Sequence, residues 1–361
     1  MHLRFIALPA LRPVLLISLL GLFFLPACEP VDPNADVADL PLEWDWKRTD
    51  HMMWAYAKAI QADSTLRPDE GFNQYLAEEA DFFLTLAGKN PNRPLRPGED
   101  SLLKASLHEV LADSLVFALL DTVQQAFPTD YDFTSGLEPA LKRLQREFPE
   151  VNALPTFRTH VNGFQQFGDW RSVDQIQLMP GYVSFGLHYF LGPDYPYYPP
   201  QVYQYQRKRF QPDYMAVRLL REIADEFITP APGNKQPSLA DMMIEAGKRQ
   251  YFVSSLLRGV PDSLIMRYSS EQMAWAEHFE EKNYAFLVDK LFETNFKLQQ
   301  EYLGDKGFTS SLSRESAPRI GEYLGWKIVQ SYMREHPAVS LAELCQRTDY
   351  EVIFRESRYK P

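Results

Sequence analysis

The clearest pattern of apolar and polar positions lies between residues 212 and 229. Its apolar residues recur every fourth position and are Met215, Leu219, Ile223 and Phe227. At about 100° per residue, this spacing places them on one face of an α-helix. Pro212 suits a first helical turn, and prolines follow the last apolar position. The pattern therefore predicts a helix over these residues.

The polar positions of this helix form two pairs of opposite charge four residues apart. Arg218 precedes Glu222 and Arg221 precedes Asp225 by this spacing. Such pairs usually lie on a solvated face. We therefore expect these four side chains to be exposed.

Glu226 is the exception, because it projects just inside the edge of the apolar arc. A carboxylate in that position needs a partner or a raised pKa. The simplest expectation is a salt bridge to an arginine of a neighbouring helix, for which Arg314 and Arg319 are the candidates. A core-facing glutamate is also a candidate functional group.

The remaining pattern predicts a mainly helical fold of the α+β class with a small sheet. Two segments rich in β-branched and aromatic residues, 155–163 and 181–192, are predicted to be strands that lie side by side. A short extended piece is expected at 43–48. Further helices are expected at about 52–60, 72–84, 101–127, 137–148, 237–251, 269–303 and 316–333.

The last of these helices carries two glycines one turn apart, Gly321 and Gly325. Each costs about 1 kcal/mol relative to alanine inside a helix, so their presence needs a reason. They would leave a groove in which the backbone of another helix can approach closely. The expected neighbour is the helix that carries Glu226. Ser316 is the expected cap, with Pro318 in the first turn.

The amino terminus has the pattern of a lipoprotein signal over residues 1–27. Two arginines precede a run of apolar residues at 14–25, and Leu25-Pro26-Ala27-Cys28 resembles a bacterial lipobox. Cys28 would then carry the lipid. Residues 28–41 are acidic and proline-containing and are expected to form a solvated tether. Residues 42–361 are expected to form one domain, in which a helical part at 42–150 and a core part at 151–361 can be distinguished.

Charge and cysteine content narrow the possible partners. The formal net charge is −11, and removing residues 1–27 takes away two positive charges, which leaves −13. This excess of negative charge argues against nucleic acid and anionic lipid as partners. The expected membrane contact is the amino-terminal lipid. If Cys28 is acylated, Cys345 has no disulfide partner and is expected to be buried.

The segment Asp225-Glu226-Phe227-Ile228-Thr229 has the spacing of the zinc-peptidase helix H-E-x-x-H. The glutamate is kept, but Asp225 and Thr229 replace the two histidines that would bind zinc. Zinc peptidases of this kind take a third ligand from a downstream helix, where Glu280 is the position to compare. We therefore expect a vestigial pocket at Asp225, Glu226, Thr229 and Glu280, with no metal, no cofactor and no catalytic residue.

Several longer motifs together resemble one family. They are Gly186-Leu-His-Tyr-Phe-Leu-Gly192, Gln206-Arg-Lys-Arg-Phe-Gln-Pro-Asp-Tyr-Met215, Asp241-Met-Met-Ile-Glu-Ala-Gly-Lys248, Ser316-Ala-Pro-Arg-Ile-Gly-Glu-Tyr-Leu-Gly-Trp-Lys-Ile-Val-Gln-Ser-Tyr-Met333 and Ser357-Arg-Tyr-Lys-Pro361. With the lipobox, they are similar to the gliding-motility lipoproteins of the GldB family. The similarity covers nearly all of the chain after the signal.

The resemblance implies a lipid-anchored protein of the cell envelope, facing the periplasm, that supports gliding motility and type IX secretion. Its partners would be other envelope proteins of those systems. It also implies a degenerate fold of the zincin peptidase type that has lost its metal. The alternative is a divergent zinc metallopeptidase in which His188, Asp225 and Glu280 bind the metal around Glu226.

Overall fold

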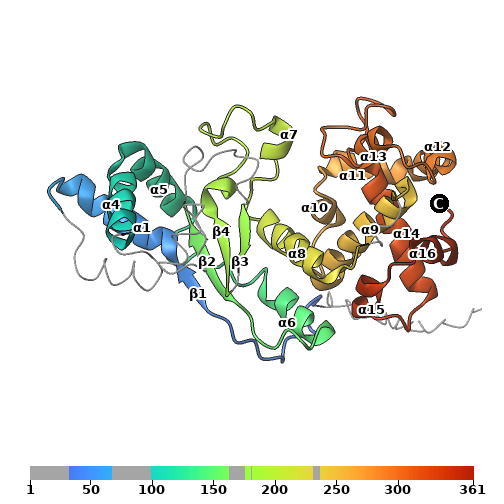
Figure 1. Cartoon of the computed structure of the whole chain (residues 1–361), viewed down its shortest axis with the longest axis horizontal. Helices are drawn as coiled ribbons and strands as arrows, with labels where there is room; N and C mark the ends of the chain where they lie inside the picture. The colour runs from blue at the N-terminus through green and yellow to red at the C-terminus, as the bar shows by residue number, and fades with distance from the viewer. Residues whose placement is uncertain (1–31, 67–98, 162–174, 180, 231–235) are drawn as a thin grey trace, which may run out of the picture.

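The computed structural model describes residues 32–66, 99–161, 175–179, 181–230 and 236–361. The amino-terminal helices lie at one end of an elongated molecule, a small sheet follows, and a larger helical assembly forms the other end (Figure 1). The predicted α+β fold, mainly helical with a small sheet, is confirmed. The expected signal segment, Cys28 and the expected helix at 72–84 lie outside the described residues. Within the part of the chain that the structure describes, none of the helices combines the length and the apolar composition that a membrane span needs.

The sheet has four strands in the order β1-β2-β4-β3. The strands are β1 Trp46–Arg48, β2 Thr156–His160, β3 Ile176–Met179 and β4 Tyr182–Gly186. β1 and β4 pair in parallel with β2, and β3 pairs antiparallel with β4. The two predicted strands are therefore adjacent, as expected. The second one ends early, because residues Leu187–Phe190 form the 3-10 helix η1.

The helices beside the sheet are α1 Thr49–Ala62, α4 Glu99–Ala112 and α5 Ser114–Ala126. The single helix expected over 101–127 is broken at Asp113. The carboxylate of Asp113 accepts hydrogen bonds from the backbone N–H groups of Leu115 and Val116, which makes it the N-cap of α5. This local capping bond explains why one apolar pattern gives two helices.

The expected solvated tether is partly folded onto the domain. Helix α6, Glu138–Glu147, carries Arg143, whose side chain is 1% exposed. Arg143 donates hydrogen bonds to the Asp36 carboxylate at 2.7 Å and to the Pro33 carbonyl at 2.8 Å. Val37 is buried in the same segment. The expectation of a free linker is therefore wrong for this stretch, because long-range arginine contacts hold it.

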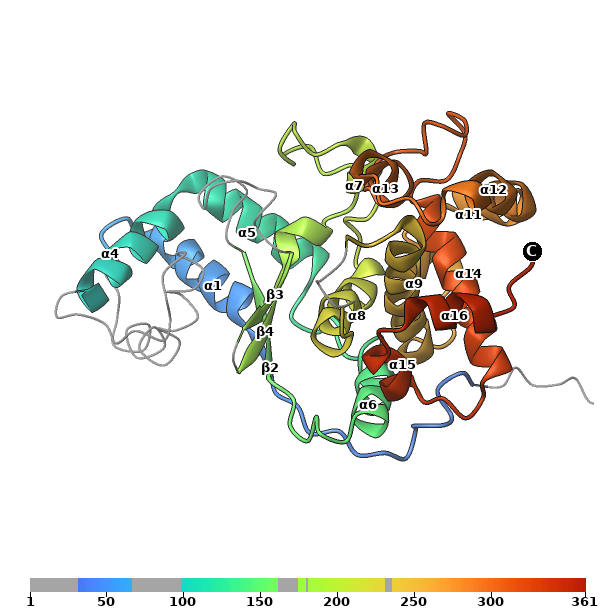
Figure 2. The same ribbon diagram turned by 45° about the vertical axis from the view of Figure 1, so that its right-hand side comes forward.

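The core of the larger assembly is formed by α8 Tyr214–Phe227, α9 Leu239–Leu256 and α14 Ile320–Glu335. Figure 2 shows α8 between the sheet and α9, with α14 on the other side of α9. The predicted helix over 212–229 is thus confirmed as α8. It packs against β3 on one side and against α9 on the other.

The glycine groove of α14 is real, but its neighbour was predicted wrongly. A Cβ atom on Gly325 would overlap the carbonyl group of Met243, and one on Gly247 would overlap the backbone of Gly325. Both Met243 and Gly247 belong to α9, so the close neighbour is α9 rather than α8. Two glycine-bearing helices can approach until their backbones touch, whereas α8 has no glycine to offer.

Helix α14 begins at Ile320, later than the predicted cap at Ser316. Arg319 has a left-handed backbone with φ 51°, which interrupts a helix. The Ser316 hydroxyl instead accepts a hydrogen bond from the Thr309 N–H at 2.9 Å. Ser316 therefore stabilises the loop that precedes α14 and does not cap the helix.

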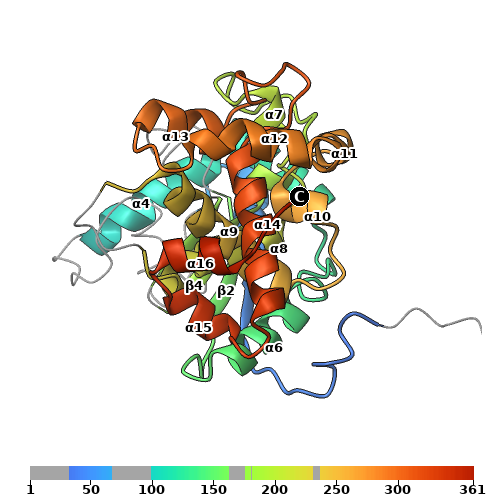
Figure 3. The same ribbon diagram turned by 90° about the vertical axis from the view of Figure 1, so that its right-hand side faces the viewer.

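The helical stretch expected over 269–303 is divided into shorter elements. Ser269 and Gln272 form a capping box at its start. The elements that follow are α11 Ser270–His278, α12 Glu280–Leu287, η2 Val288–Lys290 and α13 Phe296–Leu303. The shorter helices elsewhere are α7 Gln204–Arg207, α10 Asp262–Met266, α15 Leu341–Gln346 and α16 Tyr350–Glu356. In Figure 3, α11–α13 lie on one side of α14, and α15, α16 and α6 lie on the other.

Candidate functional site

A buried carboxylate on α14 forms ion pairs with three arginines. Glu322 is 4% exposed and lies 3.0 Å from Arg221 Nη2, 2.9 Å from Arg267 Nη2 and 3.1 Å from Arg319 Nε. The side-chain amide of Gln250 on α9 donates a further hydrogen bond to it. Residues from α8, α9, the end of α10 and the start of α14 thus meet at one charge.

Two of these arginines have an unusual backbone. Arg267 has φ 57° and Arg319 has φ 51°, both in the left-handed region. A non-glycine residue there costs roughly 1–2 kcal/mol. Arg319 is held further by the Asp305 carboxylate at 2.7 Å and by the Met266 carbonyl at 2.9 Å. The surrounding contacts therefore maintain two strained residues whose guanidinium groups reach the same carboxylate.

The electrostatics keep Glu322 ionised. Burial by itself would raise its pKa, but the nearby guanidinium groups, above all Arg267, hold that pKa below its usual range. Burial lowers the pKa of Arg267, and the adjacent Arg221 lowers it further. Taking such charges out of water costs several kcal/mol per ion before their attraction is counted. Stability alone is a weak reason for such a cluster, which makes it a candidate functional site.

A cavity of about 300 Å³ adjoins this cluster, and we call it the arginine cavity. Its lining combines four guanidinium groups, three carboxylates and a short apolar wall. The lining residues are Arg221, Arg249, Arg267, Arg319, Glu245, Asp305, Glu322, Met242, Ala246 and Leu303. The cavity is therefore a charged site at the junction of α8, α9 and α14.

The residues predicted for a vestigial peptidase pocket lie differently. Glu226 is exposed, and Asp225, 53% exposed, accepts a hydrogen bond from Arg249 Nε at 2.6 Å. The Thr229 hydroxyl donates to Gln346 at 2.7 Å. The expected burial of Glu226 was wrong. Helix α8 packs against β3 and α9, and its buried face includes Val217. Val217 lies on the opposite side of the helix from Glu226, so Glu226 faces solvent.

The predicted counter-charges of Glu226 have other roles. Arg314 is exposed, and Arg319 binds Glu322 and Asp305. Arg221 was expected to be solvated but takes part in the buried cluster. Its partner lies on a helix remote in sequence, so the spacing of charges along α8 cannot reveal it.

Glu280 is held by two tyrosines. Its carboxylate accepts hydrogen bonds from the hydroxyl of Tyr323 on α14, at 2.6 Å, and from that of Tyr359 in the carboxyl-terminal tail, at 2.7 Å. His188 is buried beside Tyr189, with ring centroids 4.3 Å apart. Within the described ranges, no three or more histidine, cysteine, aspartate or glutamate side chains are placed to hold one metal ion. The ligand set of the peptidase alternative is therefore not assembled there.

Sequence reasoning missed the residues that do meet, above all Glu322, Arg267 and Arg249. One local signal was available. The spacing of H-E-x-x-H also fits Arg221-Glu222-Ile223-Ala224-Asp225, one turn earlier, with arginine and aspartate at the two ligand positions. Arg221, at the first ligand position, binds Glu322, and Asp225, at the second, binds Arg249. Glu322 and Arg249 both line the arginine cavity.

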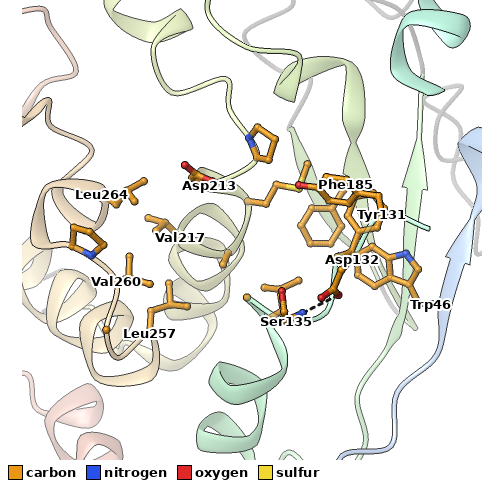
Figure 4. Close-up of a pocket in the computed structure, with 18 residues that line it drawn as sticks. Trp46, Tyr131, Asp132, Ser135, Phe185, Asp213, Val217, Leu257, Val260 and Leu264 are labelled. Carbon is orange, nitrogen blue, oxygen red and sulfur yellow. Dashed lines mark hydrogen bonds between the residues drawn. The ribbon is translucent and has the colours of Figure 1, made fainter. Parts of the chain in front are cut away.

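A second cavity of about 330 Å³ separates the sheet from the helices and is mainly apolar (Figure 4). Trp46 and Phe185 line it from the strands, and Val217, Leu257 and Leu264 line it from the helices. The Asp132 carboxylate near the edge of the cavity accepts a hydrogen bond from the Ser135 N–H at 3.0 Å, so it stabilises its own loop. This cavity offers space for an apolar group but no cluster of free charges.

Comparison with known proteins identifies one family that matches nearly the whole chain. A sequence model of the family described as gliding motility protein GldB matches residues 31–361. No curated protein and no solved structure shows a significant match.

Proposed function

Because the chain belongs to the gliding motility protein GldB family, we propose that it is a lipid-anchored envelope protein with a non-catalytic role. It would support gliding through contacts with other envelope proteins, including those linked to type IX secretion. The lipid would be attached at Cys28, and the folded domain would face the periplasm.

The observation that carries the non-catalytic role is the pairing of carboxylates with arginines. Glu322 has three arginine partners, and Asp305 accepts two hydrogen bonds from Arg209, at 2.9 and 3.0 Å. A carboxylate that serves as a metal ligand or general base needs a free lone pair toward the reacting group. Carboxylates neutralised by fixed guanidinium groups are better suited to a structural or binding role.

The docked amino-terminal segment supports an anchor that holds the domain near a membrane. Pro33 and Asp36 are fixed to α6 by Arg143. Pro33 follows Cys28 by five positions, and at ~3.6 Å per position this stretch can span at most about 18 Å. A lipid on Cys28 would therefore keep the domain close to the bilayer rather than on a long tether.

Replacing the cysteine tests the anchor. In a gliding host that lacks its own copy, wild-type protein is expected in the membrane fraction, and Cys28→Ala is expected in the soluble fraction with loss of gliding. Cys345→Ala is the matched control, because Cys345 is buried and should leave the protein on the membrane. Retention of Cys28→Ala on the membrane would refute the anchor.

A second variant tests the absence of catalysis. Glu226→Gln removes the exposed carboxylate that a peptidase would use as its general base. It should restore gliding to the same host at normal protein abundance. Loss of gliding in Glu226→Gln, together with near-stoichiometric zinc in the purified wild-type protein by elemental mass spectrometry, would favour the metallopeptidase instead.

A further inference from the structure

We propose that the arginine cavity binds the carboxylate of a small apolar acid, either a free one or the carboxyl-terminal residue of a peptide. This inference goes beyond the proposed function, since it assigns a ligand class to a site in the fold. It rests on the charges of the cavity, its hydrogen-bond donors and its apolar wall.

The charges favour a ligand with a single negative charge. Four arginines and three acidic residues line the cavity. Just outside the lining, Asp225 pairs with Arg249 and Arg209 pairs with Asp305. One guanidinium group therefore remains in excess, and a carboxylate would balance it. A phosphate brings more negative charge beside Asp305, Glu322 and Glu245, so the balance favours a carboxylate.

Two donors in the lining have no acceptor. Arg221 Nη1 and Arg267 Nε are buried and make no hydrogen bond within the described part of the chain. Both arginines already use Nη2 to hold Glu322, which fixes their orientation. A buried donor without an acceptor is unfavourable, and a guanidinium group matches the two oxygens of a carboxylate in geometry. A bound carboxylate would supply the missing acceptors.

The apolar part of the lining selects for an apolar group. Met242 and Ala246 on α9 and Leu303 at the end of α13 form it. A volume of about 300 Å³ is at the lower end of small-molecule sites. It fits a carboxylate that carries one aliphatic side chain, such as leucine at the end of a peptide.

Calorimetric titration of the full-length protein in detergent tests this with N-acetyl-leucine as the probe. N-acetyl-leucinamide is the matched control, because it has the same side chain without the charge. We expect a Kd of about 1 mM or tighter for the acid and at least tenfold weaker binding of the amide. Equal binding of acid and amide, or no binding of the acid, would overturn the proposal. Binding of inorganic phosphate in preference to the acid would also overturn it.

The free and peptide sources are separated by two further probes. Leucine carries an ammonium group beside its carboxylate, whereas Ala-Ala-Leu offers the same terminal residue on a peptide. Tighter binding of leucine would identify a free amino acid as the ligand, and tighter binding of the tripeptide would identify a peptide terminus.

Variants locate the binding. Arg221→Gln should weaken N-acetyl-leucine at least tenfold, but it also removes a partner of Glu322 and could unfold the protein. Arg249→Gln provides a second test, because Arg249 is partly exposed and its partner Asp225 is exposed. Arg355→Gln is the control, since Arg355 forms an exposed pair with Glu356 outside the cavity. Unchanged binding in Arg249→Gln, with the protein folded, would overturn the assignment to this cavity.

Discussion

Arg221 Nη2 on α8 lies 3.0 Å from Oε1 of Glu322 on α14, so one ion pair joins the two helices across the middle of the larger assembly. Arg267 and Arg319 approach the same carboxylate from the ends of α10 and α14. Glu322 is therefore an acceptor that the buried Arg319 and the partly buried Arg221 and Arg267 share. The stability of this region should depend on its charge.

Replacing Glu322 with glutamine should destabilise the protein strongly. The amide keeps the shape but leaves one buried and two partly buried guanidinium groups without their common counter-charge. Breaking a buried pair typically costs about 3–5 kcal/mol, and we expect the lower end of that range because Arg221 and Arg267 are partly exposed. Chemical denaturation would measure the loss in free energy of unfolding. Glu226→Gln is the control, because an exposed substitution should change stability by no more than about 0.5 kcal/mol. Equal stability of the two variants would contradict a central role for Glu322.

Adding a methyl group to Gly325 should separate α9 from α14. The new Cβ would overlap backbone atoms of Met243, which cannot move as a side chain could. Overpacking costs about 1–3 kcal/mol and sometimes more, and we expect the upper end for Gly325→Ala. Thermal and chemical unfolding would show it. Gly136→Ala, where a Cβ meets no atom within 4 Å, should be close to neutral.

The carboxyl-terminal tail should contribute to stability through Glu280. Tyr359→Phe removes one of the two hydroxyl groups that donate to this carboxylate. A hydrogen bond to a charged group contributes about 1.5–3 kcal/mol, so a loss in that range is expected in the free energy of unfolding. Tyr197→Phe, at an exposed ring, is the control. An unchanged unfolding midpoint in Tyr359→Phe would show that the tail is not fastened by this contact.

The docked amino-terminal segment should be sensitive to acid. The hydrogen bond from Arg143, more than any other contact, holds the pKa of Asp36 well below its usual range. A lowered folded-state pKa means that the stabilisation is present above the unfolded value of about 3.9 and is lost as the pH falls below it. Protection of residues 32–40 against hydrogen exchange, corrected for intrinsic rates, should therefore decrease below about pH 4.

The variant Asp36→Asn should show the same loss of protection at neutral pH. Asp39→Asn is the control, because Asp39 is exposed. Equal protection in the two variants would mean that Asp36 does not hold the segment.

Local patterns in the sequence were sufficient for most individual elements. The four-residue spacing from Met215 to Phe227 and the flanking prolines predict α8, since a helix buries one face and ends at proline. The β-branched segments predict β2 and β4, and the glycines of α14 predict a close helix contact. These features depend on neighbouring residues, so a single sequence reveals them.

Partners that are distant in the chain could not be predicted in this way. The helix opposite Gly325 is α9 because Gly247 leaves matching space there, and Asp36 is held by arginines more than a hundred residues away. Each of these contacts depends on how distant segments pack together, and the periodicity of apolar residues within one segment contains no information about that packing.

The sequence by itself determined the helical character of this protein, its pair of adjacent strands and its membership of the family. Only the tertiary structure decided the candidate site. Arg221 looks solvated along α8 because its neighbours alternate in charge, and it becomes buried because α9 and α14 bring Glu322 against it. Local spacing fixes the direction of a side chain on its helix, but the packing of helices determines which charge it meets.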